Sequence, residues 1–576
     1  MRAIALLALA MFSNVFSAAE STGQLVVRVL STKEISSLTV IPLSSGNSIR
    51  ACRSCRTEFI GSVLQAKAQG NDIVLSNGAR AHEFELAGRF RMKAVDENVS
   101  AAGWWELSAQ HGEMRVLLTV DTERYVALAL NGEADPKEPL ESLKAMAVAV
   151  RTYAIKNASR HSSEGFNLCD STHCQALRFG NISSQVQSAV LDTAGETLWY
   201  HGRQASAFYT QNCGGNSEDA RNVWPKVQAP YLEARRDPFC VRRASSQWHA
   251  EVSATEMQEV FKKEGWKAPA HIEAVRILRR TASGRAAELE FAGDGLRVPV
   301  SASSLRFAIN RRLGWNQLRS DSYDINLVGD VLRFDGHGYG HGVGLCQAGA
   351  FEMASEGRRY REILNFYFPG TSVGITPSDR GWQQLSGNGW TLRTTNSSTT
   401  LLNSGNVAWA KAQSLFRPRT SLQPVVRQFP STQLFRESAN EPGWMLASTQ
   451  GSEIFLQPEN ILKRNGDEND TLLHEFLHVL VEHEASPQAP LWLREGLVES
   501  LAGDPMRAAP ERHIAIQDLD LALAHPANEF ESQRAHSAAA RFTRALLARY
   551  GLEQVKQWRS SGSVPDTVIN ALPQLP

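Results

Sequence analysis

This chain of 576 residues lacks net charge, because its 60 Lys and Arg residues balance its 60 Asp and Glu residues. Without an excess of positive charge, nothing favours a nucleic acid or an anionic surface as its partner. The sequence also lacks obvious repeats and low-complexity tracts. Beyond its first twenty residues it has no apolar run long enough to span a membrane. Its length predicts roughly three or four domains.

The one extended apolar run lies at the N-terminus. Arg2 precedes the mostly apolar residues 3–16, which are followed by small residues at 17–19. Such a run is short for a membrane span, and the small residues resemble a cleavage site, so residues 1–19 are predicted to be a secretory signal peptide. An uncleaved anchor is the alternative. We therefore expect the mature protein to be exported.

Cysteine is scarce. The seven Cys residues are an odd number, so at least one of them stays unpaired even in an oxidising compartment. Cys52 and Cys55 form a CxxC pair, for which we expect a disulfide or two spare thiols rather than half of a metal site. A redox role has no supporting βαβ pattern. The pairing of Cys213 and Cys240 stays open.

Patterning divides the chain into regions. Residues 24–120 alternate short β-rich runs with Gly, Ser and Asn breaks, which predicts antiparallel sheet. Apolar residues recur at helical spacing over residues 139–158. Residues 376–396 are rich in Ser, Gly, Asn and Thr and are the best linker candidate. We expect an α+β protein, with a mixed β-rich domain at 24–375 and a mainly helical domain at 397–576.

The most informative pattern in the second half is an HExxH segment. His474 and His478 are four residues apart, so on a helix both imidazoles project from one face and can bind one metal ion. Glu475 is placed to act as a general base, and Glu495 in the next helical stretch is the natural third ligand of a zinc ion. Chance occurrence on a surface helix is the alternative. The apolar residues around the motif favour a buried helix, in which ionisable groups need a partner.

This segment resembles the gluzincin metallopeptidases, in which HExxH is followed by a WLxEG-type helix that here reads WLREG. The resemblance implies a catalytic zinc with His474, His478 and Glu495 as ligands. By the same resemblance Glu475 is the general base. Glu499, one turn beyond Glu495, is a candidate to orient the metal ligands without binding the metal itself. The Tyr or His that stabilises the transition state in this family has no assigned position.

In the first half, Glu133 follows an apolar run and precedes a proline three residues later. A carboxyl group against apolar surroundings has a raised pKa and can act as a general acid. An ordinary exposed glutamate in a turn is the alternative, and the residues alone favour that alternative.

A second group combines two imidazoles and two thiols: His161, Cys169, His173 and Cys174. Two His and two Cys are a ligand set for a closed tetrahedral zinc. Their irregular spacing predicts that a loop carries them rather than a zinc finger. A disulfide between Cys169 and Cys174 is the alternative in an exported protein.

A third feature is a glycine at every second position over residues 336–344. In an extended strand this alternation leaves bare backbone on one face and places His337, Tyr339 and His341 on the other. Glycine inside a strand indicates close approach of another backbone or of a ligand. A tightly packed strand with incidental histidines is the alternative. A phosphate loop is not expected, because the GxGxxG helix context and the P-loop lysine are missing. A helix is predicted at 347–355.

These motifs together resemble the stage II sporulation protein D and LytB-type amidase-enhancer family over about residues 25–375. One signature is EPLESLKAMAVAVRTYA, which starts at Glu138, and another is GHGVGLCQAGA, which starts at Gly340. The segment FYT, which starts at Phe208, fits the same family.

Some members of that family are lytic transglycosylases, which cut the glycan strands of peptidoglycan with an acid in a Glu-x-Pro segment. The resemblance therefore implies Glu133 as the catalytic acid, with the proline here one residue later. It also implies that His341 and Gln347 line the cleft. It further implies a structural zinc bound by the loop residues His161, Cys169, His173 and Cys174.

We therefore expect a periplasmic, extracellular or cell-wall-associated protein whose front half binds peptidoglycan glycan strands and cleaves them. A single carboxyl group, Glu133, suffices because a hydroxyl group of the sugar, rather than water, attacks the anomeric carbon. The back half is expected to be a zinc peptidase of unknown peptide substrate. The alternative for the front half is a non-catalytic wall-binding module that stimulates a separate amidase. No nucleic acid partner is expected.

Overall fold

The computed structural model describes residues 23–572, except 53, 136, 244–246, 397–398, 466–467, 504–513 and 527. The predicted signal peptide, residues 1–19, lies outside the described residues. Strands and helices are interspersed along the chain, which confirms the α+β class. The chain forms two compact units, one of Met1–Tyr125 with Ala158–Gln175 and one of Val126–Asn157 with Ala176–Pro576.

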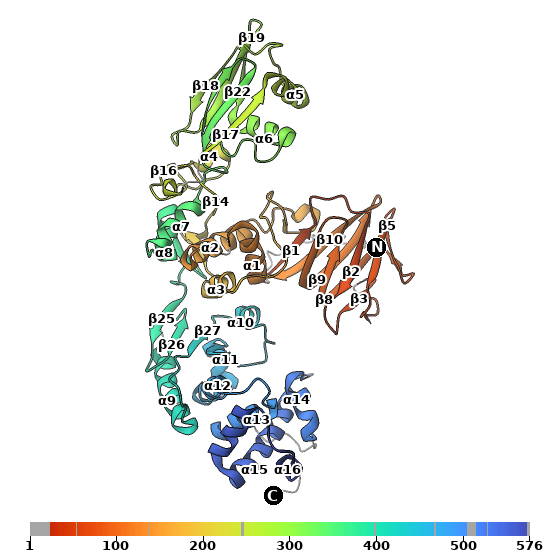
Figure 1. The fold of residues 1–576 in the computed structure, drawn as a ribbon, viewed down its shortest axis with the longest axis vertical. Coiled ribbons are helices and arrows are strands. Elements are labelled where there is room, and N and C mark those ends of the chain that lie inside the picture. Colours follow the sequence, from red (N-terminus) through yellow and green to blue (C-terminus); the bar gives the residue numbers. More distant parts are fainter. Residues whose placement is uncertain are drawn as a thin grey trace, which may run out of the picture. The chain divides into compact units, whose positions relative to one another are not determined.

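An 11-stranded sheet dominates the first unit (Figure 1), and its antiparallel hairpins confirm the β-rich prediction. The order is β11-β1-β10-β9-β8-β2-β5-β6-β7, with β3 beside β8 and β4 beside β3. Side chains alternate between buried and exposed along β5, as a strand with one covered face requires. Cys52 and Cys55 form a disulfide. The strands are β1 (Gln24–Val29), β2 (Ser37–Pro42), β3 (Ser48–Arg50), β4 (Glu58–Phe59), β5 (Leu64–Gln69), β6 (Asp72–Leu75), β7 (Arg80–Ala81), β8 (Glu83–Lys93), β9 (Asn98–Gln110), β10 (Glu113–Asp121) and β11 (Leu168–Cys169).

The loop that carries the predicted zinc ligands is tied to the edge of this sheet. It contains a short 3₁₀ turn, η1 (Ser162–Glu164), and then runs into β11, which pairs in parallel with β1. Asp170 accepts a hydrogen bond from the backbone N–H of Leu30 at 2.6 Å. Asn167 accepts one from the N–H of Val26, also at 2.6 Å. These side-chain bonds to backbone groups tie the irregular loop to β1 and to the residue that follows it.

A buried helix, α2 (Leu140–Lys156), is surrounded by other helices of the second unit and confirms the helix predicted at 139–158. Every residue from 142 to 152 is buried, and a helix that is buried all round needs neighbours on several sides. Its neighbours are α3 (Ser184–Asp192), α7 (Gln347–Ser355) and α8 (Tyr360–Tyr367), and α7 has the bounds that the sequence predicts.

The segment of alternating glycines is not a continuous strand, so that expectation is wrong. β22 (Val331–His337) ends where the segment begins, and β23 (Leu345–Cys346) follows it. The glycines between them have positive φ angles, which glycine adopts without steric cost, so the alternation reflects repeated left-handed residues. The close backbone approach that glycine predicts is nevertheless present. A Cβ on Gly344 would lie 2.1 Å from the carbonyl oxygen of Phe208. The left-handed glycines are Gly338, Gly340, Gly342 and Gly344.

A further body of the second unit follows β14 (Tyr209–Thr210), which pairs in parallel with β23. Two three-stranded sheets, β17-β22-β21 and β18-β19-β20, enclose a core with two helices. Its elements are β17 (Gln247–Ser253), α5 (Ala254–Glu264), β18 (Ala274–Arg280), β19 (Ala286–Gly293), β20 (Leu296–Ser301), α6 (Ala302–Leu313) and β21 (Tyr323–Val328). Shorter elements are β12 (Thr197–Tyr200), β13 (Arg203–Gln204), β15 (Asn216–Ser217), α4 (Ala220–Val223), β16 (Arg235–Arg236), η2 (Cys240–Arg242) and β24 (Ser372–Gly374).

The C-terminal part contains a 5-stranded sheet that the sequence patterns do not indicate, in the order β25-β26-β27-β29-β28. Its first two strands, β25 (Gln383–Ser386) and β26 (Thr391–Thr394), lie within the linker candidate 376–396. Trp390 and Leu392 enter the core from this otherwise polar segment. A domain boundary there stays a prediction. The other strands are β27 (Val425–Gln428), β28 (Ala447–Gln450) and β29 (Glu453–Leu456).

Helices form the rest of the C-terminal part. As predicted, the HExxH motif lies in a helix, α12 (Glu468–His483). Pro490 directly precedes the next helix, α13 (Leu491–Ala502). Within the part of the chain that is described, no helix is both long and apolar enough to cross a membrane. The other helices are α9 (Thr399–Phe416), α10 (Thr432–Ala439), α11 (Glu459–Asn465), α14 (Ile516–Ala524), α15 (Glu529–Ser561) and α16 (Asp566–Ile569).

Candidate functional site

Glu133 is the last residue of α1 (Thr122–Glu133), and its Oε1 atom accepts a hydrogen bond from the backbone N–H of Ala176 at 2.7 Å. Gly132 permits this approach, because a Cβ there would lie 2.2 Å from the carbonyl oxygen of Ala176. A second bond joins the helix end to the same segment: Asn131 Nδ2 donates to the carbonyl oxygen of Arg178 at 3.1 Å. The helix end therefore fixes the position of the Glu133 carboxyl group.

The environment of Glu133 favours the protonated form of its carboxyl group. The side chain is half-buried rather than exposed, and desolvation raises its pKa. Hydrogen bonds from the Ala176 N–H and from the side chain of Tyr209 oppose this rise but do not cancel it. The carboxyl group therefore keeps its proton to a higher pH than a free glutamate does, as a general acid requires.

Gln347 and His341 are both connected to Glu133, one directly and the other through Tyr209. Gln347 Nε2 donates to the backbone carbonyl oxygen of Glu133 at 2.9 Å. The His341 ring hydrogen-bonds to the backbone of Tyr209, whose side chain bonds to Glu133. Burial lowers the pKa of His341 to about 3, so its imidazole is neutral, and Nδ1 accepts from the N–H of Val343 at 3.0 Å. The structure thus gathers the three predicted residues around Tyr209, which the sequence marks only through the FYT signature.

His341 also lines a cavity of about 240 Å³. Buried charged residues, including Arg285 and Asp321, form part of its wall. Glu133 does not line this cavity. A polar cavity of this kind suits ligand binding, and it is a feature separate from the carboxyl group of Glu133.

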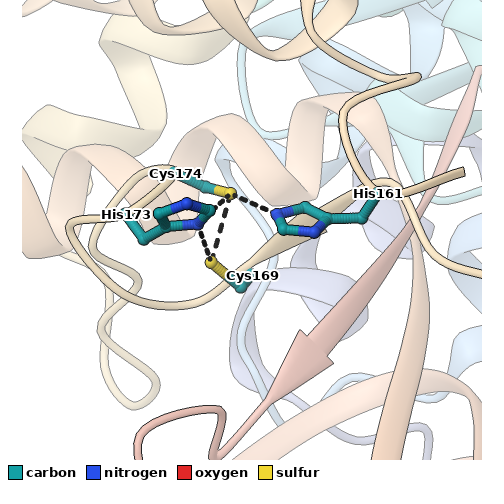
Figure 2. A group of neighbouring side chains, drawn as sticks. All are labelled: His161, Cys169, His173 and Cys174. Atoms are coloured by element: carbon teal, nitrogen blue, oxygen red, sulfur yellow. Dashed lines mark hydrogen bonds between the residues drawn. The ribbon is translucent and has the colours of Figure 1, made fainter. Parts of the chain in front are cut away.

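In the first unit, the four predicted loop ligands converge on one point, as Figure 2 shows for His161, Cys169, His173 and Cys174. The two Sγ atoms are 3.1 Å apart. His161 Nε2 lies 3.4 Å from the Sγ of Cys174, and His173 Nδ1 lies 3.6 Å from the Sγ of Cys169. Ligand atoms around one tetrahedral zinc are roughly 3.3–3.8 Å apart, given the usual Zn–S and Zn–N bond lengths. The two separations between histidine nitrogen and sulfur fall in this range, and the Sγ–Sγ separation is slightly shorter, so the four donors lie close enough together to share one metal ion.

The chemistry of the two thiols supports the same assignment. Both are free rather than joined in the alternative disulfide. Their mutual hydrogen bond is the chief cause that lowers the pKa of Cys169 to about 4 and raises that of Cys174. A bound cation would relieve this competition for one proton, because it favours two thiolates. Glu164 Oε1 lies 2.6 Å from His161 Nδ1 and so orients the opposite ring nitrogen towards the sulfur atoms.

In the C-terminal part, α12 and α13 bring His478 to Glu495, and the ligand atoms close enough to share one metal ion here are those of His478, Glu482 and Glu495. The Nε2 atoms of His474 and His478 are 3.0 Å apart, and Glu495 Oε2 is 3.5 Å from His478 Nε2. Glu495 Oε2 is buried, yet it has no hydrogen-bond partner among the described residues, which is costly for a carboxylate oxygen. Burial lowers the pKa of each histidine to about 4, so both are neutral. Neutral imidazoles and an unsatisfied carboxylate fit a zinc ion.

Glu475 lies on the same helix and is held by one hydrogen bond. Thr449 Oγ1 donates to Glu475 Oε2 at 2.6 Å. Burial raises the pKa of Glu475 to about 7. A carboxyl group with a pKa near neutrality suits a residue that accepts a proton and later returns it.

His536 on α15 belongs to this site, although no motif in the sequence marks it. Its Nδ1 lies 3.7 Å from Glu495 Oε2 and 3.1 Å from Glu499 Oε1. Burial lowers the pKa of His536, but its bond to Glu499 and the nearby carboxylates outweigh burial, so the pKa is raised. The sequence feature that could have indicated this contact is Gly496. A Cβ there would lie 2.3 Å from the carbonyl oxygen of Ala539, so glycine lets α15 approach α13. Glu499 thus contacts His536, which lies beside the predicted ligand Glu495.

Two family models match the front part of the chain. Residues 110–200 match the model described as stage II sporulation protein, SpoIID, and residues 240–344 match a domain of unknown function, DUF8618. The first match contains Glu133 and the predicted loop ligands. The second ends inside the glycine segment.

Curated proteins are similar to less than half of the chain. An uncharacterized protein of Brachyspira hyodysenteriae is 29% identical, over 45% of this chain and 68% of its own length. The amidase enhancer of Bacillus subtilis is 26% identical, over 41% of this chain and 38% of its own length. Stage II sporulation protein D of the same organism is 24% identical, over 44% and 74%. The matched part therefore spans less than half of the amidase enhancer but most of the other two. The front part is related to these proteins.

A solved structure of an M1 zinc metallopeptidase from Deinococcus radiodurans is similar at 13% identity, with a TM-score of 0.21, over 44% of this chain and 56% of that one. Likeness at this level carries no argument. The zinc assignment in the C-terminal part therefore rests on the side-chain geometry alone.

Each of the two predicted zinc sites should account for one metal ion. We expect Cys174→Ala to lower the zinc content of the purified full-length chain by one ion, because three ligands no longer close the loop site. His478→Ala should lower it by one as well, and the double variant by two. Elemental analysis by mass spectrometry measures the content. His271→Ala, at a side chain that is 83% exposed, is the control and should change nothing. A folded variant of either site with unchanged zinc would contradict that assignment.

Proposed function

We propose that this chain is an exported peptidoglycan-acting enzyme whose front part is a lytic transglycosylase and whose C-terminal part is a zinc-dependent peptidase. The observation that carries the first half of the proposal is the raised pKa of Glu133, a carboxyl group fixed at a helix end beside Tyr209 and Gln347. The relationship to stage II sporulation protein D and the amidase enhancer supports peptidoglycan as the substrate.

The proposed glycan reaction needs one carboxyl group. Glu133 donates its proton to the glycosidic oxygen as the bond between that oxygen and the anomeric carbon breaks. A hydroxyl group of the same sugar then forms a bond to the anomeric carbon and releases its proton to the Glu133 carboxylate. The enzyme ends with the proton that it began with, and no water is consumed. This balance explains why a second catalytic carboxylate, which hydrolytic glycosidases use, is not required.

The proposed peptidase reaction uses Glu475 as the proton carrier. A zinc ion at His474, His478 and Glu495 would supply a Lewis acid that polarises a peptide carbonyl group. Glu475, with its pKa raised to about 7, accepts a proton from the attacking water and returns it to the leaving amine. The hydrogen bond from Thr449 orients its carboxyl group for both transfers.

A second candidate function for the front part is stimulation of a separate amidase without cleavage. The name of the similar Bacillus subtilis protein, amidase enhancer, favours it. The cavity lined by His341, which does not include Glu133, gives a binding module a place to hold a ligand. Wild-type protein that binds glycan, yields no products alone and speeds an added amidase would select this function over the first.

We expect Glu133→Gln to reduce cleavage of purified glycan strands by roughly 10²- to 10⁴-fold, which is the usual contribution of a general acid. Chromatography with mass spectrometry measures the release of anhydro-sugar products. The matched control is Asp135→Asn, two residues away, where an exposed carboxylate accepts the N–H of Lys137. The control should keep its activity. Undiminished product release by a folded Glu133→Gln variant would rule out Glu133 as the acid.

The pH dependence of glycan cleavage should reflect the protonation state of the Glu133 carboxyl group. Because Glu133 acts in its protonated form, activity should fall as the pH rises through its raised pKa. Tyr209→Phe removes a donor that stabilises the carboxylate, so the pKa rises further and the alkaline limb should move up by roughly half to one pH unit. Tyr339→Phe, which loses a bond to Asn316, should leave the limb in place. A limb that shifts downward in Tyr209→Phe would refute the proton assignment.

Glu475→Gln should abolish peptide cleavage while the protein keeps its C-terminal zinc, because the amide cannot carry the proton but is not a ligand. A library of quenched fluorescent peptides measures cleavage, and elemental analysis measures the zinc. Glu459→Gln, at the half-buried start of α11, is the control. Wild-type turnover in the folded Glu475→Gln variant argues against the base role. A zinc-loaded wild type that cleaves no peptide argues against the peptidase itself.

A further inference from the structure

Three thiols that neither proposed reaction uses meet in the second unit. The side chains of Cys213, Cys240 and Cys346 are at most 2% exposed, and the carboxyl group of Asp237 joins them at 1% exposure. One ligand atom from each of the four residues lies within 4.8 Å of the others. The distance between the Sγ atoms of Cys213 and Cys240 is 3.4 Å, and all three cysteines are free.

The four residues come from three separate segments. Cys213 follows β14, Asp237 lies just before η2 and Cys240 begins it, and Cys346 ends β23 directly before α7. Packing around them is tight: a Cβ on Gly349 would lie 2.6 Å from Asp237 Oδ2. A glycine at that position of α7 therefore leaves room for the cluster.

Backbone groups are aimed at the sulfur atoms. The N–H of Cys213 donates to the Sγ of Cys346 at 3.2 Å, and the N–H of Gly215 donates to the Sγ of Cys240 at 3.1 Å. Such donors stabilise negative charge on sulfur, so they favour thiolates over thiols. Thiolates are the form of cysteine that binds metal ions.

Asp237 is oriented by its own bonds. Its Oδ1 atom accepts from the N–H of Phe239 at 3.0 Å and from the N–H of Cys240 at 3.1 Å. Its Oδ2 atom accepts from the hydroxyl group of Tyr367 at 2.8 Å. The same oxygen lies 3.2 Å from the Sγ of Cys213. Oδ2 is therefore turned toward the sulfur atoms, as a fourth ligand must be.

We propose that Cys213, Cys240, Cys346 and Asp237 bind a structural zinc ion. Four donors fill a tetrahedral site and leave no open position for substrate, which is the arrangement of a structural zinc. Three thiolates and one carboxylate carry the same charge as the four thiolates of a common structural zinc site. Three thiols cannot all pair as disulfides, whereas one metal ion accommodates all three.

This zinc would brace the Glu133 site without taking part in its chemistry. Cys346 pairs with Thr210 across β14 and β23, so the metal ion clamps the strands next to Tyr209 on one side and Gln347 on the other. Zinc binding here does not depend on the proposed function, because the ligands are present whether or not the front part cleaves glycan.

The test uses full-length protein exported to an oxidising compartment and purified without reductant or chelator. In native protein, Cys213, Cys240 and Cys346 should resist alkylation. After denaturation with a zinc chelator, all three should be alkylated without any reducing agent, as read by peptide mass spectrometry. A peptide pair linked by a disulfide between any two of the three would overturn the proposal, and this measurement needs no variant.

Metal content provides the second arm. Cys240→Ala should contain one zinc ion fewer per chain than wild type, while the loop and HExxH sites keep theirs. Cys52→Ala with Cys55→Ala is the matched control, because it removes two cysteines that form a disulfide with each other in the first unit, and its zinc content should equal that of wild type. Equal zinc in folded Cys240→Ala and wild type would overturn the proposal. If Cys240→Ala does not fold, the alkylation experiment on the wild-type protein decides between zinc-bound thiolates and a disulfide.

Discussion

The front part of this protein depends on one close approach between two stretches of backbone. The left-handed glycines between β22 and β23 lie against residues 208–214 with no room for side chains of their own. A Cβ on Gly340 would lie 2.4 Å from Thr210 Oγ1, and one on Gly338 would lie 2.9 Å from the carbonyl oxygen of Asn212. Because positive φ is easy only for glycine, no other residue satisfies both the angle and the space. This contact sets Tyr209 beside Glu133, places Gln347 on the end of α1, and brings Cys213 to Cys346.

Burial shifts the pKa values of ionisable groups in both proposed sites, and the two proposed reactions use these shifts in different ways. Desolvation raises the pKa of both Glu133 and Glu475. Glu133 is proposed to act without water or metal, so its proton alone must activate the leaving group. Glu475 stands beside two imidazoles and a carboxylate that fit zinc, so its task is limited to proton transfer. The loop cluster of Figure 2 and the cluster around Cys240 have four donors each, which suits structural roles rather than catalysis.

Local patterns predict much of this arrangement. Spacing along a helix places His474 and His478 on one face, and Pro490 marks the start of α13. Helical periodicity locates α2, and the bounds of α7 are predicted correctly. The alternating glycines predict a close contact but not its form, because a period of two fits both a strand and a series of left-handed residues. The strands β25 and β26 escape notice because most of their residues are polar.

A single sequence does not indicate which distant segments of the chain contact one another. His536 reaches Glu495 from a helix that no motif connects to α13. Cys213, Cys240 and Cys346 have no regular spacing, so only the fold brings them to Asp237. Tyr209 bonds to Glu133 across 76 positions of chain, a separation over which hydrophobic periodicity carries no information.

The central claim is that one carboxyl group cuts glycan without consuming water. Digestion of purified glycan strands by the wild-type protein in water enriched in ¹⁸O tests it most directly, with product masses read by mass spectrometry. The account predicts anhydro-sugar ends that contain no ¹⁸O, since the oxygen that attacks the anomeric carbon belongs to the sugar. Reducing ends that carry ¹⁸O would contradict it, because they require water as the nucleophile.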